Sequence, residues 1–202
     1  YNTALKFKGK HALEIGCWLG WSTAHLAAGG VILDVVDPAL SEPTIYESVD
    51  RSLYLAGVRS SVNLHPGYSP EKVEEVALRD DRRWSLIFID GNHEYPAPLQ
   101  DAQVVERYAA EDALILFHDL VSPSVAEGLT YLQNRGWKTA IYQTMQIMGV
   151  AWLGNVCPVE HIPDPSVRWT LPKHLEDYCI IGFDSVMLQD WRTGLPKDVM
   201  NS

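Results

Sequence analysis

The chain has 202 residues, of which 47% are hydrophobic, 10% aromatic and 21% charged, a composition typical of a globular protein with one sizeable core. Its net charge of -10 makes nucleic acid and anionic membrane surfaces poor partners, so we expect a small-molecule partner. No apolar run approaches the ~20 residues of a membrane helix, no export signal is recognisable, and the three cysteines match no disulfide or zinc spacing, which together predict a cytoplasmic protein.

Short apolar runs alternate with helical patterns over residues 1–155. Strands are expected at 11–16, 31–37, 61–65, 84–90, 113–119, 137–145 and 147–154, and helices at 22–28, 43–57, from 69 onward, 96–109 and 122–135. The serine at 69 is the expected N-cap of the third of these helices. The alternation favours a parallel sheet covered on both faces, and the short connection near residue 146 makes the last strand pair antiparallel. The sequence therefore predicts a Rossmann-like, doubly wound α/β domain with a mostly parallel seven-stranded sheet and its ligand crevice at the carboxyl ends of the strands.

Residues 156–202 differ from the preceding domain. Prolines punctuate this segment, which also carries the large aromatic residues Trp169, Tyr178, Phe183 and Trp191. So many aromatic residues argue against a disordered tail. We expect an ordered C-terminal extension that caps the crevice or forms the subunit interface of a homo-oligomer.

A loop with two glycines follows the first expected strand. Gly16 permits a tight turn out of the strand, and Gly20 lets the following helix approach. A dinucleotide-binding loop needs another glycine where the backbone meets a pyrophosphate, but Trp18 stands at that position. Glu14, at the strand end, would repel phosphate and attract an ammonium or sulfonium group. The loop therefore favours a cationic, phosphate-free nucleoside over NAD.

A second acid, Asp37, ends the second expected strand, where a carboxylate can accept hydrogen bonds from both hydroxyls of a ribose. One acid for a cation and one for a ribose describe S-adenosylmethionine. The glycine loop and the segment Val36-Asp37-Pro38 resemble the first two motifs of class I S-adenosylmethionine-dependent methyltransferases, over about residues 10–155. The resemblance also implies that the segment Gly67-Tyr68-Ser69 contacts the adenine. The cofactor-binding residues expected from the pattern and this resemblance are Glu14, Gly16, Gly20, Ser22, Asp37, Ser69 and Asp90.

A second group of polar residues follows the fourth and fifth expected strands. Asp90 and His93 come after the fourth strand, and His118 and Asp119 end the fifth. Neighbouring strands lie roughly 5 Å apart, so these residues should meet at the mouth of the crevice. The pattern I-D-G-x-H-x-Y with a later F-H-D resembles a subfamily grouped with the macrocin-type sugar O-methyltransferases and the cephalosporin-hydroxylase-like proteins. The resemblance implies methyl transfer to a hydroxyl of a small molecule.

Catechol-type O-methyltransferases share a divalent ion held at these two strand ends, and the expected ligands here are Asp90, His93 and Asp119. Mg²⁺ would lower the pKa of a bound substrate hydroxyl. Asn92 offers oxygen without charge, and His118 stands where the catechol-type enzymes place an acid, so Mn²⁺, Fe²⁺, Zn²⁺ or no metal stay open. Without metal, the catalytic set is Asp90 with His93 or His118 as general base, and His93 is preferred because it lies on the loop.

Other functions stay open on the sequence alone. A metal-dependent hydrolase or an oxygenase-like enzyme could use the same acid–histidine mouth, and a binding module without catalysis could keep the same fold. Asp101, on the helix after the fourth strand, is interpreted either as a residue that supports the site from behind or, with preference, as a solvated helix acid.

Overall fold

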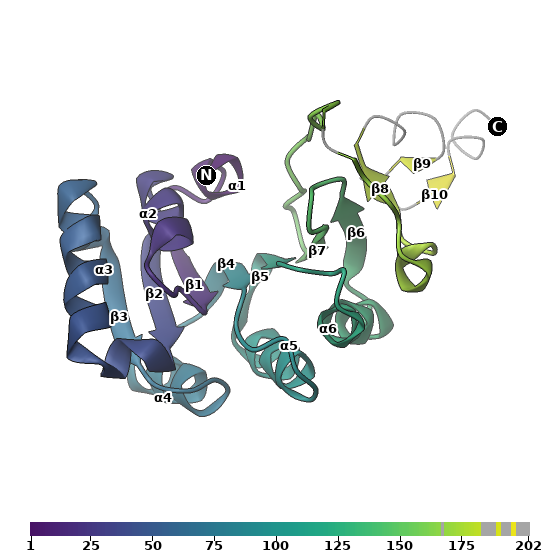
Figure 1. Cartoon of the computed structure of the whole chain (residues 1–202). Helices are drawn as coiled ribbons and strands as arrows, with labels where there is room; N and C mark the ends of the chain where they lie inside the picture. Colours follow the sequence, from purple (N-terminus) through teal and green to yellow (C-terminus); the bar gives the residue numbers. More distant parts are fainter. Residues whose placement is uncertain (167, 183–188, 191–194, 197–202) are drawn as a thin grey trace.

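The computed structural model describes residues 1–166, 168–182, 189–190 and 195–196. One sheet of eight strands runs through the molecule in the order β3-β2-β1-β4-β5-β7-β6-β8 (Figure 1). Its strands are β1 (His11–Ile15), β2 (Ile32–Asp37), β3 (Val62–Pro66), β4 (Trp84–Ile89), β5 (Ala109–Phe117), β6 (Lys138–Tyr142), β7 (Met148–Leu153) and β8 (Ile180–Ile181). Two further short strands, β9 (Gln189–Asp190) and β10 (Leu195–Pro196), form a separate antiparallel pair.

The strand directions confirm the predicted doubly wound sheet. β3, β2, β1, β4 and β5 pair in parallel, whereas β7 runs antiparallel to both β5 and β6. The chain reverses its winding direction between β1 and β4, and such a switch point opens a crevice at the carboxyl ends of the strands. The sheet has one strand more than the sequence predicts, because β8 pairs with β6 and covers the backbone groups that an edge strand leaves unpaired.

Helices cover both faces of the sheet (Figure 1). One face carries α4 (Glu71–Arg79), α5 (Ala97–Tyr108) and α6 (Pro123–Asn134), and the other carries α1 (Asn2–Leu5), α2 (Trp21–Ala28) and α3 (Pro43–Leu55). The single-turn helices are η1 (Pro38–Ser41), η2 (Arg59–Ser61) and η3 (Lys173–Leu175). Each face buries its own apolar core, and burial of this surface supplies the main driving force for folding. Among the described residues, no helix is long and apolar enough to cross a bilayer.

The described part of the C-terminal extension packs against both cores. Val156 and Val159 lie against the core on the face of α2 and α3, whereas Trp169 and Leu175 lie against the core on the face of α6. Phe183 and Trp191 lie outside the described residues. The extension therefore wraps the β6 edge of the sheet, and its role in a subunit interface stays a prediction.

A buried carboxylate on β2 forms hydrogen bonds with side chains of β3 and β4. Asp34 on β2 is fully buried; the indole Nε1 of Trp84 donates to its Oδ2 at 2.9 Å, and the amide of Asn63 donates to its Oδ1 at 3.1 Å. His65 Nε2 lies 3.1 Å from Oδ1, and Arg82 Nε lies 3.3 Å from Oδ2. Burial alone would raise the pKa of Asp34, but these hydrogen bonds and the charge of Arg82 hold it below its usual value.

Candidate functional site

Backbone hydrogen bonds continue across the carboxyl ends of the central strands. The N–H of Gly16 donates to Val36 O at 2.9 Å, and the N–H of Asp90 donates to Ile15 O at 2.8 Å. The N–H of His118 donates to Ile89 O at 3.0 Å. The sheet register thus sets the first residues after β1, β4 and β5 side by side.

A pocket of about 800 Å³ opens at this edge of the sheet. Residues of the predicted sites that line it are Gly16, Ser22, Asp37, Ser69, Asp90 and His118. Glu14, Gly20, His93 and Asp119 are not among its lining residues. No described residue beyond His118 lines the pocket, and the expected role of the extension as a cap or a subunit interface stays a prediction.

Gly16 brings the loop after β1 into contact with the end of β4. Its φ of +84° lies in the left-handed region, and a Cβ at this position would meet the carbonyl group of Asp90, with the carbonyl carbon at 2.6 Å. Gly20 precedes α2 with a φ of +81°, and a Cβ there would lie 3.1 Å from a methyl group of Val49 on α3. Both positions therefore favour glycine for their conformation, and Gly16 also requires it for space.

The Asp37 carboxylate holds the glycine loop. Its Oδ2 accepts hydrogen bonds from the N–H groups of Cys17 at 2.7 Å and Trp18 at 2.9 Å, and its Oδ1 accepts one from the N–H of Ala39 at 2.7 Å. An ionised carboxylate offers about four acceptor positions, so about one remains on Oδ1 for a ligand. The sequence analysis predicted only that Asp37 accepts hydrogen bonds from both ribose hydroxyls. It did not predict that Asp37 also holds the N–H groups of the loop.

Glu14 lies behind the loop rather than in the pocket. Its side chain is fully buried, and its Oε2 accepts a hydrogen bond from the hydroxyl of Thr23 at 2.5 Å, while Oε1 has no hydrogen-bond partner among the described residues. Burial raises the pKa of Glu14 to about 7, against the opposing hydrogen bonds of Ser22 and Thr23. The sequence analysis predicted that Glu14 attracts the cofactor's cation. That contact stays a prediction, and the burial of Glu14 outside the pocket does not favour it.

The raised pKa of Glu14 predicts a pH-dependent stability. The folded protein holds a proton on this carboxyl between pH 4.5 and about 7 that the unfolded chain releases, so stability falls as the pH rises through that window. Relative to Glu14→Gln, we expect the free energy of unfolding of the wild type to drop by about 3 kcal/mol between pH 4.5 and pH 8. Denaturant unfolding of both proteins at the two pH values measures this change. The same difference in free energy of unfolding between wild type and Glu14→Gln at both pH values would contradict the prediction.

Ser69 and Asp101 form a pair on the pocket wall that the sequence analysis did not predict. Ser69 was expected to cap α4, but the residue that precedes α4 is Pro70, and the Ser69 hydroxyl instead donates to Asp101 Oδ1 at 2.5 Å. Asp101 is only 3% exposed, and burial raises its pKa to about 6. The prediction of a solvated helix acid is therefore wrong. The available signal was its position three or four residues from Pro98, Val104 and Val105, which are buried on the same helix.

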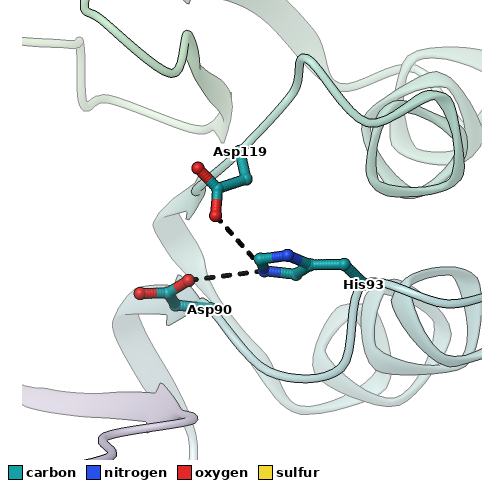
Figure 2. A group of neighbouring side chains, drawn as sticks. All are labelled: Asp90, His93 and Asp119. Carbon is teal, nitrogen blue, oxygen red and sulfur yellow. Dashed lines mark ion pairs between the residues drawn. The ribbon is translucent and has the colours of Figure 1, made fainter.

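Figure 2 shows the side chains of Asp90, His93 and Asp119 converging from the ends of β4 and β5. His93 Nε2 lies 3.5 Å from Asp90 Oδ1 and 3.6 Å from Asp119 Oδ2. One ligand atom from each of the three residues lies within 4.8 Å of the others, a spacing that could hold a metal ion. Asp119 has a φ of +60°, in the left-handed region that Asp adopts more readily than most non-glycine residues and that recurs at functional sites.

His118 reaches the same two carboxylate oxygens. Its Nδ1 lies 3.3 Å from Asp90 Oδ1 and 3.1 Å from Asp119 Oδ2. The neighbouring Asp90 carboxylate, against the effect of burial and with help from Asp119, raises the pKa of His118 to about 9. The acid–histidine cluster thus comprises Asp90, His93, His118 and Asp119.

The sequence model of a methyltransferase domain family matches residues 13–120, more than half of the chain. The chain belongs to this methyltransferase family. The matched residues run from β1 to just beyond β5, so they include the glycine loop, Asp37 and the acid–histidine cluster. The family confirms the methyltransferase part of the sequence prediction.

Solved methyltransferase structures share the fold of this domain. The O-methyltransferase TomG of Streptomyces achromogenes, solved in complex with SAM, has a TM-score of 0.65 at 18% identity, covering 75% of this chain and 76% of that one. An O-methyltransferase of Bacillus cereus in complex with SAH has a TM-score of 0.65 at 14% identity, covering 76% and 78%. A putative O-methyltransferase of Klebsiella pneumoniae has a TM-score of 0.61 at 21% identity, covering 75% and 80%. No curated protein sequence matches the chain.

Proposed function

We propose that this methyltransferase domain binds S-adenosylmethionine and transfers its methyl group to a hydroxyl oxygen of a small molecule. The observation that carries the proposal is the single pocket that joins the glycine loop, Asp37 and Ser69 to Asp90 and His118 of the acid–histidine cluster. Two of the solved structures with this fold are O-methyltransferases that hold SAM or SAH. The subfamily resemblance carried by Asp90, His93 and His118 supports the same type of acceptor.

The pocket fits an adenosine-type cofactor. Its volume of about 800 Å³ lies within the range of small-molecule sites and leaves room for an acceptor. Asp37 offers an acceptor position for a ribose hydroxyl, and Val36, Pro38 and Tyr68 supply apolar wall on the side of Ser69. Since Trp18 occupies the position where a pyrophosphate would meet a glycine, this pocket suits S-adenosylmethionine better than NAD.

The chemistry that the bound cofactor supplies is a methyl group made electrophilic by its sulfonium. The domain must therefore align an acceptor oxygen and help to remove its proton. Asp90, His93 and Asp119 would hold a divalent ion, Mg²⁺ or another, that lowers the pKa of an acceptor hydroxyl bound to it. Where no ion is bound, proton removal falls to His93 beside Asp90. His118 lines the pocket, but its pKa, raised to about 9, keeps it protonated at neutral pH.

Binding of S-adenosylhomocysteine tests the cofactor assignment. We expect calorimetry to detect one site per chain for S-adenosylmethionine and for S-adenosylhomocysteine, with no comparable affinity for NAD. Asp37→Ala should weaken binding of S-adenosylhomocysteine at least about tenfold, because it removes a charged acceptor that holds Cys17 and Trp18. Asp81→Ala, an exposed turn residue, is the matched control and should leave the affinity unchanged.

Two results would overturn this assignment. One is tighter binding of NAD than of either adenosyl ligand. The other is absence of adenosyl binding with normal uptake of divalent metal, which would favour the hydrolase or oxygenase-like enzyme. Binding without methyl transfer to any hydroxyl compound would support the binding module instead.

A further inference from the structure

The acid–histidine cluster contains two ring nitrogens that no hydrogen bond satisfies. His93 Nε2 and His118 Nδ1 are both buried atoms, and neither has a hydrogen-bond partner among the described residues. A buried polar atom left without a partner is unfavourable, and here two occur in one cluster. Their distances of 3.1–3.6 Å to the carboxylates exceed the ~2.7–2.9 Å of a charge-assisted hydrogen bond. Ion pairing with the two carboxylates therefore does not fully satisfy the two ring nitrogens.

The nitrogen–oxygen spacings in the cluster match the edges of a metal coordination shell. Each nitrogen faces the same pair of oxygens, Asp90 Oδ1 and Asp119 Oδ2, at 3.1–3.6 Å. Ligands at ~2.0–2.2 Å from an ion lie about 3.0 Å apart at right angles and about 3.4 Å apart in a tetrahedron. Each imidazole can therefore share an ion with both carboxylates after only small side-chain movements.

The chemistry of the donors determines which ions fit. Two carboxylates balance the charge of a dication, and two imidazoles add neutral nitrogen ligands. The Oδ1 of Asn92 accepts a hydrogen bond from the N–H of Glu94 at 2.9 Å, which uses one of its two acceptor positions. Mg²⁺ prefers an all-oxygen shell with several waters, whereas imidazole ligands suit Fe²⁺, Co²⁺ and Zn²⁺.

We propose that Asp90, His93, His118 and Asp119 together form a binding site for a transition-metal dication of the Fe²⁺-to-Zn²⁺ series rather than for Mg²⁺. His118, considered above as a general base, is the fourth ligand. The catalytic role of this ion, activation of the acceptor hydroxyl, rests on the proposed function. The choice of metal itself is independent of catalysis.

Metal titration of the chelator-stripped protein tests the site. By calorimetry we expect one Co²⁺ and one Zn²⁺ per chain, each bound at least about a hundredfold more tightly than Mg²⁺. The visible absorption of bound Co²⁺ should show nitrogen coordination. His118→Asp exchanges one nitrogen for oxygen and should reduce the preference for Zn²⁺ over Mg²⁺ at least about tenfold. His25→Ala removes a histidine outside the cluster and should leave both affinities unchanged.

The outcomes separate this inference from the proposed function. Equal affinity for Mg²⁺ and Zn²⁺, no metal binding, or unchanged selectivity in the folded His118→Asp variant would overturn the metal site, whether or not S-adenosylhomocysteine binds. Failure of S-adenosylhomocysteine to bind would overturn the proposed function and leave the metal affinities valid. Because the wild-type selectivity is decisive on its own, the test holds even where a variant does not fold.

Discussion

The substitution Gly16→Ala is expected to lower the affinity for S-adenosylhomocysteine at least about a hundredfold and to destabilise the domain by about 2–5 kcal/mol. A Cβ at this position would meet the carbonyl group of Asp90 and would lie 2.9 Å from the Cα of Gly91, and a φ of +84° is itself unfavourable for alanine. The loop and the end of β4 would have to separate. Calorimetry and denaturant unfolding measure the two effects.

A matched control separates the steric clash from the backbone cost. Gly57 has a similar φ of +71°, and no atom lies within 4 Å of a Cβ added there. Gly57→Ala should therefore cost only the about 1–2 kcal/mol of the left-handed conformation and should not change ligand affinity. If Gly16→Ala binds S-adenosylhomocysteine as the wild type does, the close approach of loop and strand has no part in forming the pocket.

The Gly16 contact couples the glycine loop to the acid–histidine cluster. The same backbone segment that turns at Gly16 touches the residue that begins the acid–histidine cluster, Asp90. Asp37 holds the next two N–H groups of this loop from the other side. The loop is thus held between β2 and β4, and a disturbance on either side is expected to move both the proposed cofactor region and the cluster.

Most of the fold and the strand-end residues could be predicted from the sequence. Alternating apolar runs and helical patterns predict a doubly wound, mostly parallel sheet, because parallel neighbours need helical crossovers. Once Asp90 and His118 stand at the ends of adjacent strands, the sheet register brings them together. The glycines at 16 and 20 could likewise be interpreted, because a left-handed turn and a close helix contact both favour glycine.

The missed features depend on partners far away in the sequence. The hydroxyl of Ser69 was assigned to a helix cap that is common locally, but it bonds to Asp101, 32 residues away. β8 has only two residues and no periodicity, so only its pairing with β6 defines it. The burial of Glu14 behind the loop follows from the packing of α2 on β1, which the strand-end pattern does not encode. Local patterns predict elements, whereas tertiary contacts decide which polar group faces the pocket.

The substitution Asp34→Ala is expected to lower the free energy of unfolding by about 3–5 kcal/mol, because it leaves buried donors and the charge of Arg82 without their acceptor. Denaturant unfolding at pH 7 measures the loss. Since the pKa of Asp34 is lowered in the folded protein, its stabilising effect is present above the unfolded value of 3.8 and is lost as the pH falls through the folded pKa. The gap between wild type and variant should therefore narrow below about pH 4.

Asp34 lies outside the pocket, so this substitution tests whether a residue of β2 can support stability without affecting ligand binding. Asp34 lies three residues before Asp37 on β2 and does not line the pocket, so the folded fraction of Asp34→Ala should bind S-adenosylhomocysteine with wild-type affinity. Asp80→Ala, which removes a partly exposed contact of the same Arg82, should lose far less stability. A loss as small as that of Asp80→Ala would show that the buried carboxylate contributes little. A loss of affinity in the folded variant would show instead that the amino-terminal half of β2 helps to shape the pocket.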